Sequence, residues 1–205
     1  MRRLIHAIKD DSLSIVLFVL FAICISAQSF AGWQLQNETL AAHGRAAVGY
    51  WHNLSTGTFL VGLATNCQAA FLQLDSLIVF SGFLYQRGAP HSRDPLKPKN
   101  RRKRSEEANS LFLAFVLLFF LSLVLDVVVG NKAYNEERGL MNQPPIHVAG
   151  FLLSAKFLSS TLQTWQAEYL AIALFVLLSV FLRQQDSAES KSVESSDETT
   201  GEANK

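Results

Sequence analysis

Two stretches decide the fold: residues 13–32, LSIVLFVLFAICISAQSFAG, and residues 111–130, LFLAFVLLFFLSLVLDVVVG. They occupy matching positions of a repeat, because residues 12–92 align with residues 110–190 at a constant offset of 98, with 18 of 81 pairs identical. Repetition at a fixed period is typical of a supersecondary unit copied in tandem. Each copy runs as an apolar block, a polar connector and a second apolar block, so the sequence predicts a duplicated two-helix unit.

The apolar blocks are long enough to cross a membrane. They cover residues 13–32, 59–84, 111–130 and 157–182. A helix that rises about 1.5 Å per residue needs roughly 20 residues to cross a hydrocarbon layer of about 30 Å. Backbone polar groups must be satisfied inside lipid, which favours helices over loops and open sheets. We therefore expect an all-α membrane protein with four transmembrane helices.

Positive charge orients these helices. Of the 18 Lys and Arg residues, 14 lie before the first block, between the second and third blocks or after the last block, and 4 lie in the two connectors. Because Lys and Arg are retained in the cytoplasm, both termini are expected there, and the two repeats are expected to be parallel, with the same orientation. A cleaved signal peptide is the alternative for the first block, but Asp10 and Asp11 directly precede it and its copy lies in mid-chain.

The repeats cover residues 12–92 and 110–190. The three segments that lie outside them are polar. Residues 1–11 are expected to form a cytoplasmic N-terminal segment and residues 191–205 a disordered acidic tail. Residues 93–109 form a basic linker with the run Asn-Arg-Arg-Lys-Arg at 100–104. We expect the linker to attract anionic lipid headgroups; nucleic-acid binding is the alternative interpretation, and no nucleic acid is expected as a partner.

Two sets of short motifs carry a resemblance to a known family. The first copy contains Gln28-Ser29, Gly32-Trp33, Asn37-Glu38, His43-Gly44 and Gln86-Arg87-Gly88, and the second contains Asn135-Glu136, Trp165-Gln166 and Glu168-Tyr169-Leu170. The chain resembles, over residues 2–191, a bacterial family of integral membrane proteins of unknown function, the DUF6766-type family. The resemblance implies a multi-pass protein of the bacterial inner membrane and supplies no activity.

Asp75 is the strongest candidate for an intramembrane site. It lies near the middle of the second block, where an ionisable side chain is costly and by default functional. Gln68 and Gln73 lie on the same predicted helix and complete the candidate polar site. The functional interpretation is a proton or cation relay; the structural one is a protonated Asp bonded across a helix interface. The matching residue of the second copy is Ala173, so the two copies differ here.

Acidic residues near the outer ends of the third and fourth blocks form a second candidate site. The expected outer acidic cluster consists of Asp126, Glu168, Gln166 and Glu136. Paired carboxylates bind a cation or share a proton. The alternative is that the side chains simply reach toward water at the interface.

The two connectors both contain an Asn-Glu pair soon after a block ends. We expect Asn37 and Glu38, and likewise Asn135 and Glu136, to cap short helices lying in the membrane interface. A ligand-binding role for the paired connectors is the alternative.

Soluble-enzyme chemistry has little support in the sequence. Cys24 and Cys67 lie within apolar blocks, the five histidines show no metal-site spacing, and there is no phosphate-binding glycine loop. We expect no cofactor, no metal and no enzyme activity. The favoured function is a non-enzymatic envelope or partner-binding membrane protein, alone or as a homo-oligomer. The alternatives are a small proton- or cation-coupled carrier using Asp75 and the outer acidic cluster, and a membrane enzyme acting on a lipid or quinone.

Overall fold

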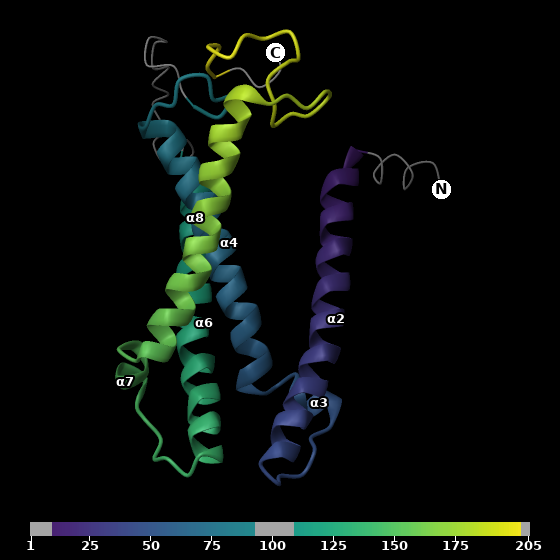
Figure 1. The fold of residues 1–205 in the computed structure, drawn as a ribbon, viewed down its shortest axis with the longest axis vertical. Helices are drawn as coiled ribbons and strands as arrows, with labels where there is room; N and C mark the ends of the chain where they lie inside the picture. Colours follow the sequence, from purple (N-terminus) through teal and green to yellow (C-terminus); the bar gives the residue numbers. More distant parts are fainter. Residues whose placement is uncertain (1–9, 93–108, 202–205) are drawn as a thin grey trace. The chain divides into compact units, whose positions relative to one another are not determined.

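The computed structural model describes residues 10–92 and 109–201 of the chain. Within these ranges the secondary structure is helical, and the helices that are long and apolar enough to cross a membrane are α2 (Ser12–Ala42), α4 (Gly57–Phe83), α6 (Ser110–Leu140) and α8 (Ala155–Phe181). Two short helices, α3 (Tyr50–Asn53) and α7 (Val148–Leu152), lie in the connectors (Figure 1). The expected basic linker lies outside the described residues except for its last residue, and so do residues 1–9 and 202–205.

The duplication seen in the sequence also governs the secondary structure. Helices α2 and α6 begin and end at positions separated by the repeat offset of 98, and so do α4 and α8. The short helices α3 and α7 also begin at matching positions, Tyr50 and Val148. Because only 18 of 81 aligned pairs are identical, the same fold is specified mainly by the pattern of apolar and polar residues.

Helices α2 and α6 are longer than the apolar blocks that predicted them. They continue for ten residues past Gly32 and Gly130, because the polar segments that follow are rich in good helix formers. Each helix ends where the backbone becomes left-handed, at Gly44 (φ 65°) and at its repeat mate Asn142 (φ 55°). Both ends carry the hydrogen bond of a Schellman motif, Arg45 N–H to Leu40 O at 2.8 Å and its equivalent at 2.9 Å.

The helix ends correct the expected caps. Asn37 and Glu38 lie inside α2, and Asn135 and Glu136 lie inside α6, so none of them caps the start of a short helix. Helix α3 instead follows Gly49, which has no side chain, and α7 follows His147, whose side chain makes no capping hydrogen bond. The prediction was wrong because a single glycine in a helix-favouring sequence does not end a helix.

The described chain divides into two compact units. Unit 1 comprises Met1–Gly62 and Val129–Pro145, and unit 2 comprises Leu63–Val128 and Ile146–Lys205. In unit 1 the connector after α2 folds back onto that helix, with the Ser29 and Tyr50 hydroxyl groups 2.7 Å apart. The Trp33 ring packs edge-on against Tyr50, with ring centroids 5.9 Å apart.

In unit 2, α6 contacts both α4 and α8. Phe71 of α4 packs against Phe115 of α6 at a centroid distance of 6.1 Å. Phe119 of α6 packs against Trp165 of α8 at the same centroid distance. The N-terminus of α8 is capped by Ser154, whose hydroxyl accepts the Phe157 N–H at 3.2 Å.

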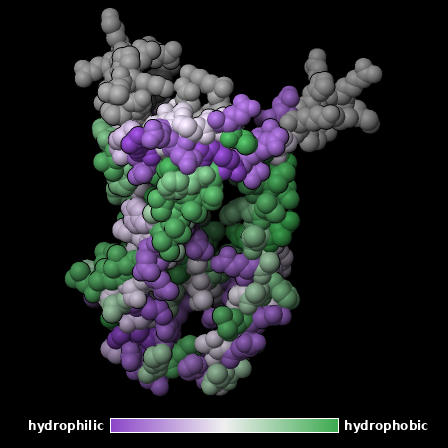
Figure 2. Space-filling model, turned by 45° about the horizontal axis from the view of Figure 1, so that its top comes forward, coloured by the Kyte–Doolittle hydropathy of each residue, from purple (hydrophilic) through white to green (hydrophobic). Residues whose placement is uncertain are grey.

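Large apolar side chains cover the surface of the long helices. Phe18 is 73% exposed and Leu121 is 58% exposed. Figure 2 shows broad hydrophobic areas below a hydrophilic band, with further hydrophilic residues mixed among hydrophobic ones over the lower half of the view. Apolar patches of this extent are unfavourable in water and mark a surface that contacts lipid or another apolar partner.

Candidate functional site

The expected intramembrane site lies in unit 2, on α4. Gln68 is fully buried and Asp75 is 8% exposed, whereas Gln73 is partly exposed. Neither amide atom of Gln68 has a hydrogen-bond partner, and Asp75 Oδ1 also lacks one. Burying such groups without a partner costs several kcal/mol in an apolar medium. The burial of these two unpartnered polar groups on one helix is therefore unfavourable for the stability of unit 2.

The residues of the expected outer acidic cluster take separate roles. Asp126 is buried and its carboxylate accepts a hydrogen bond from the Thr65 hydroxyl at 2.8 Å, which joins α6 to α4. Glu168 on α8 is partly exposed and Gln166 is exposed. Glu136 lies in unit 1, where its carboxylate is 4.0 Å from the Lys132 ammonium group. Among the residues that the structure describes, no three His, Cys, Asp or Glu side chains gather to hold a metal ion.

Asn37 has a role that the sequence did not indicate. Its side-chain oxygen accepts the Val48 N–H at 2.8 Å, and its amide nitrogen donates to the Val48 carbonyl at 3.2 Å. The Trp33 indole N–H donates to the same carbonyl at 2.7 Å. Asn37 therefore pairs with a backbone unit of the connector and fixes the returning chain against α2.

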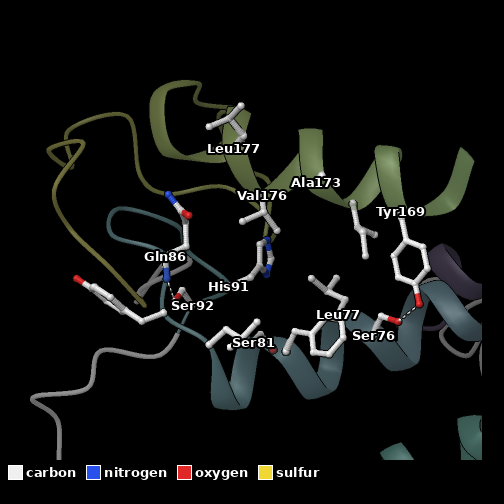
Figure 3. A pocket seen from close by; sticks show the side chains of 14 residues that line it. Ser76, Leu77, Ser81, Gln86, His91, Ser92, Tyr169, Ala173, Val176 and Leu177 are labelled. Atoms are coloured by element: carbon white, nitrogen blue, oxygen red, sulfur yellow. Dashed lines mark hydrogen bonds between the residues drawn. The ribbon is translucent and has the colours of Figure 1, made fainter. Parts of the chain in front are cut away.

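A pocket of about 570 Å³ lies between α4 and α8 in unit 2 (Figure 3). Ser76 and Tyr169 close one end, with a hydrogen bond of 3.3 Å between their hydroxyl groups. The other end is formed by the loop after α4, including His91 and Ser92. Between these ends, the lining is mainly apolar and comes from the following residues: Leu77, Phe80, Leu84, Ile172, Val176 and Leu177.

The loops that follow α4 and α8 have the same backbone conformation. In each, a serine hydroxyl accepts a backbone N–H six residues earlier, Gln86 N to Ser92 Oγ at 2.8 Å and its repeat equivalent at 2.9 Å. Both loops place a left-handed residue at the same repeat position, Gly88 (φ 82°) and Asp186 (φ 61°). This loop is part of the duplicated unit, although the residues around the shared Gln and Ser differ.

The two loops contact each other through matching positions. His91 Nε2 lies 3.1 Å from the backbone carbonyl of Glu189 and 3.4 Å from its carboxylate, and Glu189 is the repeat mate of His91. The His91 ring also packs on Phe175 of α8, with ring centroids 4.9 Å apart. His91 therefore joins the two repeats at the loop end of the pocket.

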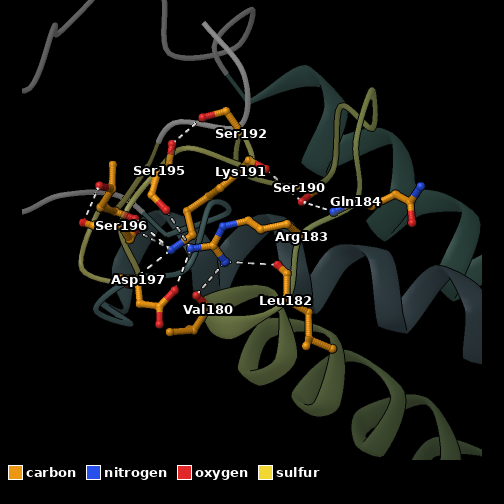
Figure 4. Close-up of polar contacts among 11 residues, drawn as sticks. Val180, Leu182, Arg183, Gln184, Ser190, Lys191, Ser192, Ser195, Ser196 and Asp197 are labelled. Carbon is orange, nitrogen blue, oxygen red and sulfur yellow. Dashed lines mark hydrogen bonds and ion pairs between the residues drawn. The ribbon is translucent and has the colours of Figure 1, made fainter.

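The segment after α8 folds over these loops (Figure 4). Lys191 is fully buried, and its ammonium group donates to the backbone carbonyls of Ser196, Asp197 and Thr199 at 3.1–3.4 Å. Burial lowers the pKa of Lys191, the nearby Arg183 lowers it further, and Asp197 opposes both effects. The tail expected to be disordered begins at Lys191, and its backbone carbonyls are the acceptors for this buried cation.

Further contacts fix this C-terminal segment to both repeats. The Arg183 guanidinium binds the Asp197 carboxylate at 2.7 Å. The Thr200 hydroxyl accepts the Gly88 N–H at 2.8 Å. A Cβ atom at Gly88 would collide with the backbone carbonyl of Asp197, so this close approach requires glycine. Sequence reasoning missed the segment because its composition alone is that of a solvated chain.

The class of protein is set by these features: it is a multi-pass membrane protein built from two tandem copies of a helical unit. The chain belongs to the family described as "Domain of unknown function (DUF6766)", which matches residues 4–110 and again residues 107–202. The predicted family and the predicted duplication are thus confirmed. Neither a curated protein nor a solved structure matches the chain.

Proposed function

We propose that this chain is a non-enzymatic protein of the bacterial inner membrane that works by binding a partner in the envelope. The observation that carries this proposal is the use of intramembrane polar groups for helix–helix contacts. The Asp126 carboxylate is bonded to the Thr65 hydroxyl at 2.8 Å, and Ser76 is bonded to Tyr169 at 3.3 Å. Hydrogen bonds of this kind hold membrane helices together, so these groups have a structural role.

The proposed topology has both repeats crossing the membrane in the same direction, with both termini in the cytoplasm. The contact between His91 and Glu189 supports it, because these residues follow α4 and α8 and must lie on one side of the membrane. The excess of Lys and Arg in the segments outside the connectors supports the cytoplasm as that side. The basic linker would then lie against anionic headgroups, and α3 and α7 would lie in the opposite interface.

Cysteine accessibility tests this topology. A single cysteine at Ser187, after α8, is expected to react with a membrane-impermeant maleimide only after the membrane is permeabilised. A single cysteine at Arg45, after α2, is expected to react in intact cells. Cys24 and Cys67 are replaced by alanine in both variants, which removes the background labelling. Labelling of both sites from the same side of the membrane would overturn the parallel arrangement.

A second function, a proton- or cation-coupled carrier, is favoured by one specific observation. Gln68 and Asp75 are buried, and both carry polar atoms without a hydrogen-bond partner. An intramembrane carboxyl group with an unpartnered oxygen suits a proton relay, with Gln73 nearby on the same helix. In this function Glu168 and Gln166 would serve the outer entrance.

Proteoliposomes decide between the two functions. The purified full chain is reconstituted with an internal pH-sensitive dye, and the decay of an imposed pH gradient is followed for the wild type and for Asp75→Asn. The binding function predicts the same decay for both proteins and for empty vesicles. A faster decay in the wild type that Asp75→Asn abolishes would overturn the binding function and establish the carrier.

A further inference from the structure

The pocket between α4 and α8 has the length of half a bilayer. Its apolar part extends along α4 from Ser76 to Leu84, a rise of roughly 12 Å at the usual 1.5 Å per residue. One leaflet of a hydrocarbon layer of about 30 Å is roughly 15 Å thick. The pocket therefore spans one leaflet, from the Ser76–Tyr169 hydrogen bond to the loop that follows α4.

Polarity changes along the pocket in the same way as along a lipid molecule. The walls are made by leucine, isoleucine, valine and phenylalanine side chains, whereas Gln86, His91 and Ser92 line the loop end. Figure 3 shows Gln86 and Ser92 at this end, the His91 ring below Val176 between the two helices, and the Ser76–Tyr169 pair at the other end. Apolar walls with a few polar groups at one end are typical of a pocket for a hydrophobic ligand.

The width of the pocket limits what can occupy it. The Ser76–Tyr169 hydrogen bond of 3.3 Å joins α4 to α8 at one end, so the space between these helices narrows there and does not admit a helix of about 10–12 Å diameter along its whole length. A transmembrane helix of a partner, or of a second copy of this chain, is therefore too thick. Water is disfavoured, because a water molecule needs two to four polar partners and the walls supply few.

We propose that this pocket binds one acyl chain of a membrane phospholipid. The chain lies between α4 and α8 with its methyl end toward Ser76 and Tyr169. The headgroup lies at the loop end, beside Gln86 and His91, at the level where the loops of the two repeats meet. Lipid binding at this pocket extends the proposed binding function. It rests on that proposal in one respect, because α4 and α8 must lie in a bilayer.

Photolabelling of the full chain tests the proposal. The protein is reconstituted in vesicles of phosphatidylethanolamine and phosphatidylglycerol that contain a trace of phospholipid with a diazirine at the end of one acyl chain. After irradiation, labelled peptides are mapped by mass spectrometry. The reference is peptide 13–23, which is exposed apolar surface of α2. We expect peptides 76–84 and 169–177 to be labelled at least about tenfold more strongly than this reference. Tenfold is the enrichment that a site preference of about 1.4 kcal/mol gives.

Two tryptophan variants on one helix provide the matched comparison. Val176→Trp replaces a small side chain of the lining by a bulky indole ring and is expected to reduce pocket labelling to the level of the α2 peptide. Leu178→Trp makes the same kind of change two residues away, at an exposed position outside the lining, and is expected to leave pocket labelling unchanged. Circular dichroism and gel filtration establish that both variants are folded.

Three results would overturn the proposal. One is even labelling of all exposed apolar helices in the wild type, a measurement that needs no variant. Another is pocket labelling that a folded Val176→Trp variant retains. The third is a photo-crosslinked dimer in which a second chain occupies the pocket. None of these results depends on proton flux, so failure of the lipid site is distinguishable from failure of the proposed function.

Discussion

Replacing Gly57 by alanine should loosen unit 1, because α4 begins in direct contact with α6. A Cβ atom at Gly57 would lie 2.7 Å from the backbone nitrogen of Ala133, 2.8 Å from its Cα and 2.9 Å from its Cβ. Carbon atoms prefer separations of about 3.5–4.0 Å, so the two helices must move apart by nearly 1 Å. Overpacking of this kind costs about 1–3 kcal/mol. The contact is specific to this position, since the second repeat carries Ala155 at the matching place.

Unfolding in mixed micelles measures this cost. The free energy of unfolding is obtained from circular dichroism as a denaturing detergent is added to the purified chain. Gly57→Ala is expected to lower it by about 1–3 kcal/mol. The control is Gly82→Ala on the same helix, where no atom lies within 4 Å of the new Cβ. Its expected effect has the opposite sign, a gain of up to about 1 kcal/mol from helix propensity.

A second-site change makes the test sharper. Ala133→Gly removes only one of the three close atoms, because the other two belong to the backbone. The loss caused by Gly57→Ala should therefore persist in the double variant. A Gly57→Ala protein as stable as the wild type, or a complete rescue by Ala133→Gly, would refute the close backbone approach of these helices.

Three further predictions concern the polar contacts. Asn37→Leu should lower the free energy of unfolding by about 1–3 kcal/mol and speed amide hydrogen exchange at Val48, which loses its acceptor. Unchanged exchange, measured by mass spectrometry, would contradict the Asn37–Val48 hydrogen bond. Thr65→Val should cost a similar amount in the micelle assay, because it leaves the buried Asp126 without its donor, and equal stability would show that another group supports this carboxylate. For Lys191, the folded-state pKa lies below the unfolded value of about 10.4, so the unfolded chain binds the proton more tightly. The free energy of unfolding should therefore rise with pH between the two pKa values, and Lys191→Met, measured over the same pH range, should lack this rise.

The sequence predicted the long helices well because the features that indicate them lie within contiguous residues. Apolar length is sufficient to indicate a membrane helix, and the repeat offset of 98 places matching helices at matching positions. The ends of α2 and α6 were less predictable. They depend on where the backbone turns left-handed, at Gly44 and Asn142, and a polar segment with helix-forming residues gives no earlier signal.

The sequence indicates which residues are candidates but not which groups they contact. A polar residue in an apolar block is unfavourable to bury, and the sequence alone does not identify its hydrogen-bond partner. Asp126 was assigned to an acidic cluster, and the structure instead pairs it with Thr65, 61 positions away. Asp75 and Gln68, two other candidates, are both buried in the structure.

The sequence by itself determined that this protein is a duplicated, all-helical membrane protein, because hydropathy, helix length and internal repetition are properties of contiguous residues. The tertiary structure alone decided which distant groups meet. It joined Ser76 to Tyr169, placed His91 against its own repeat mate Glu189, and enclosed Lys191 with backbone carbonyls. The physical reason is that hydrogen bonds and pockets depend on the rotation and register of packed helices, which many different apolar sequences permit.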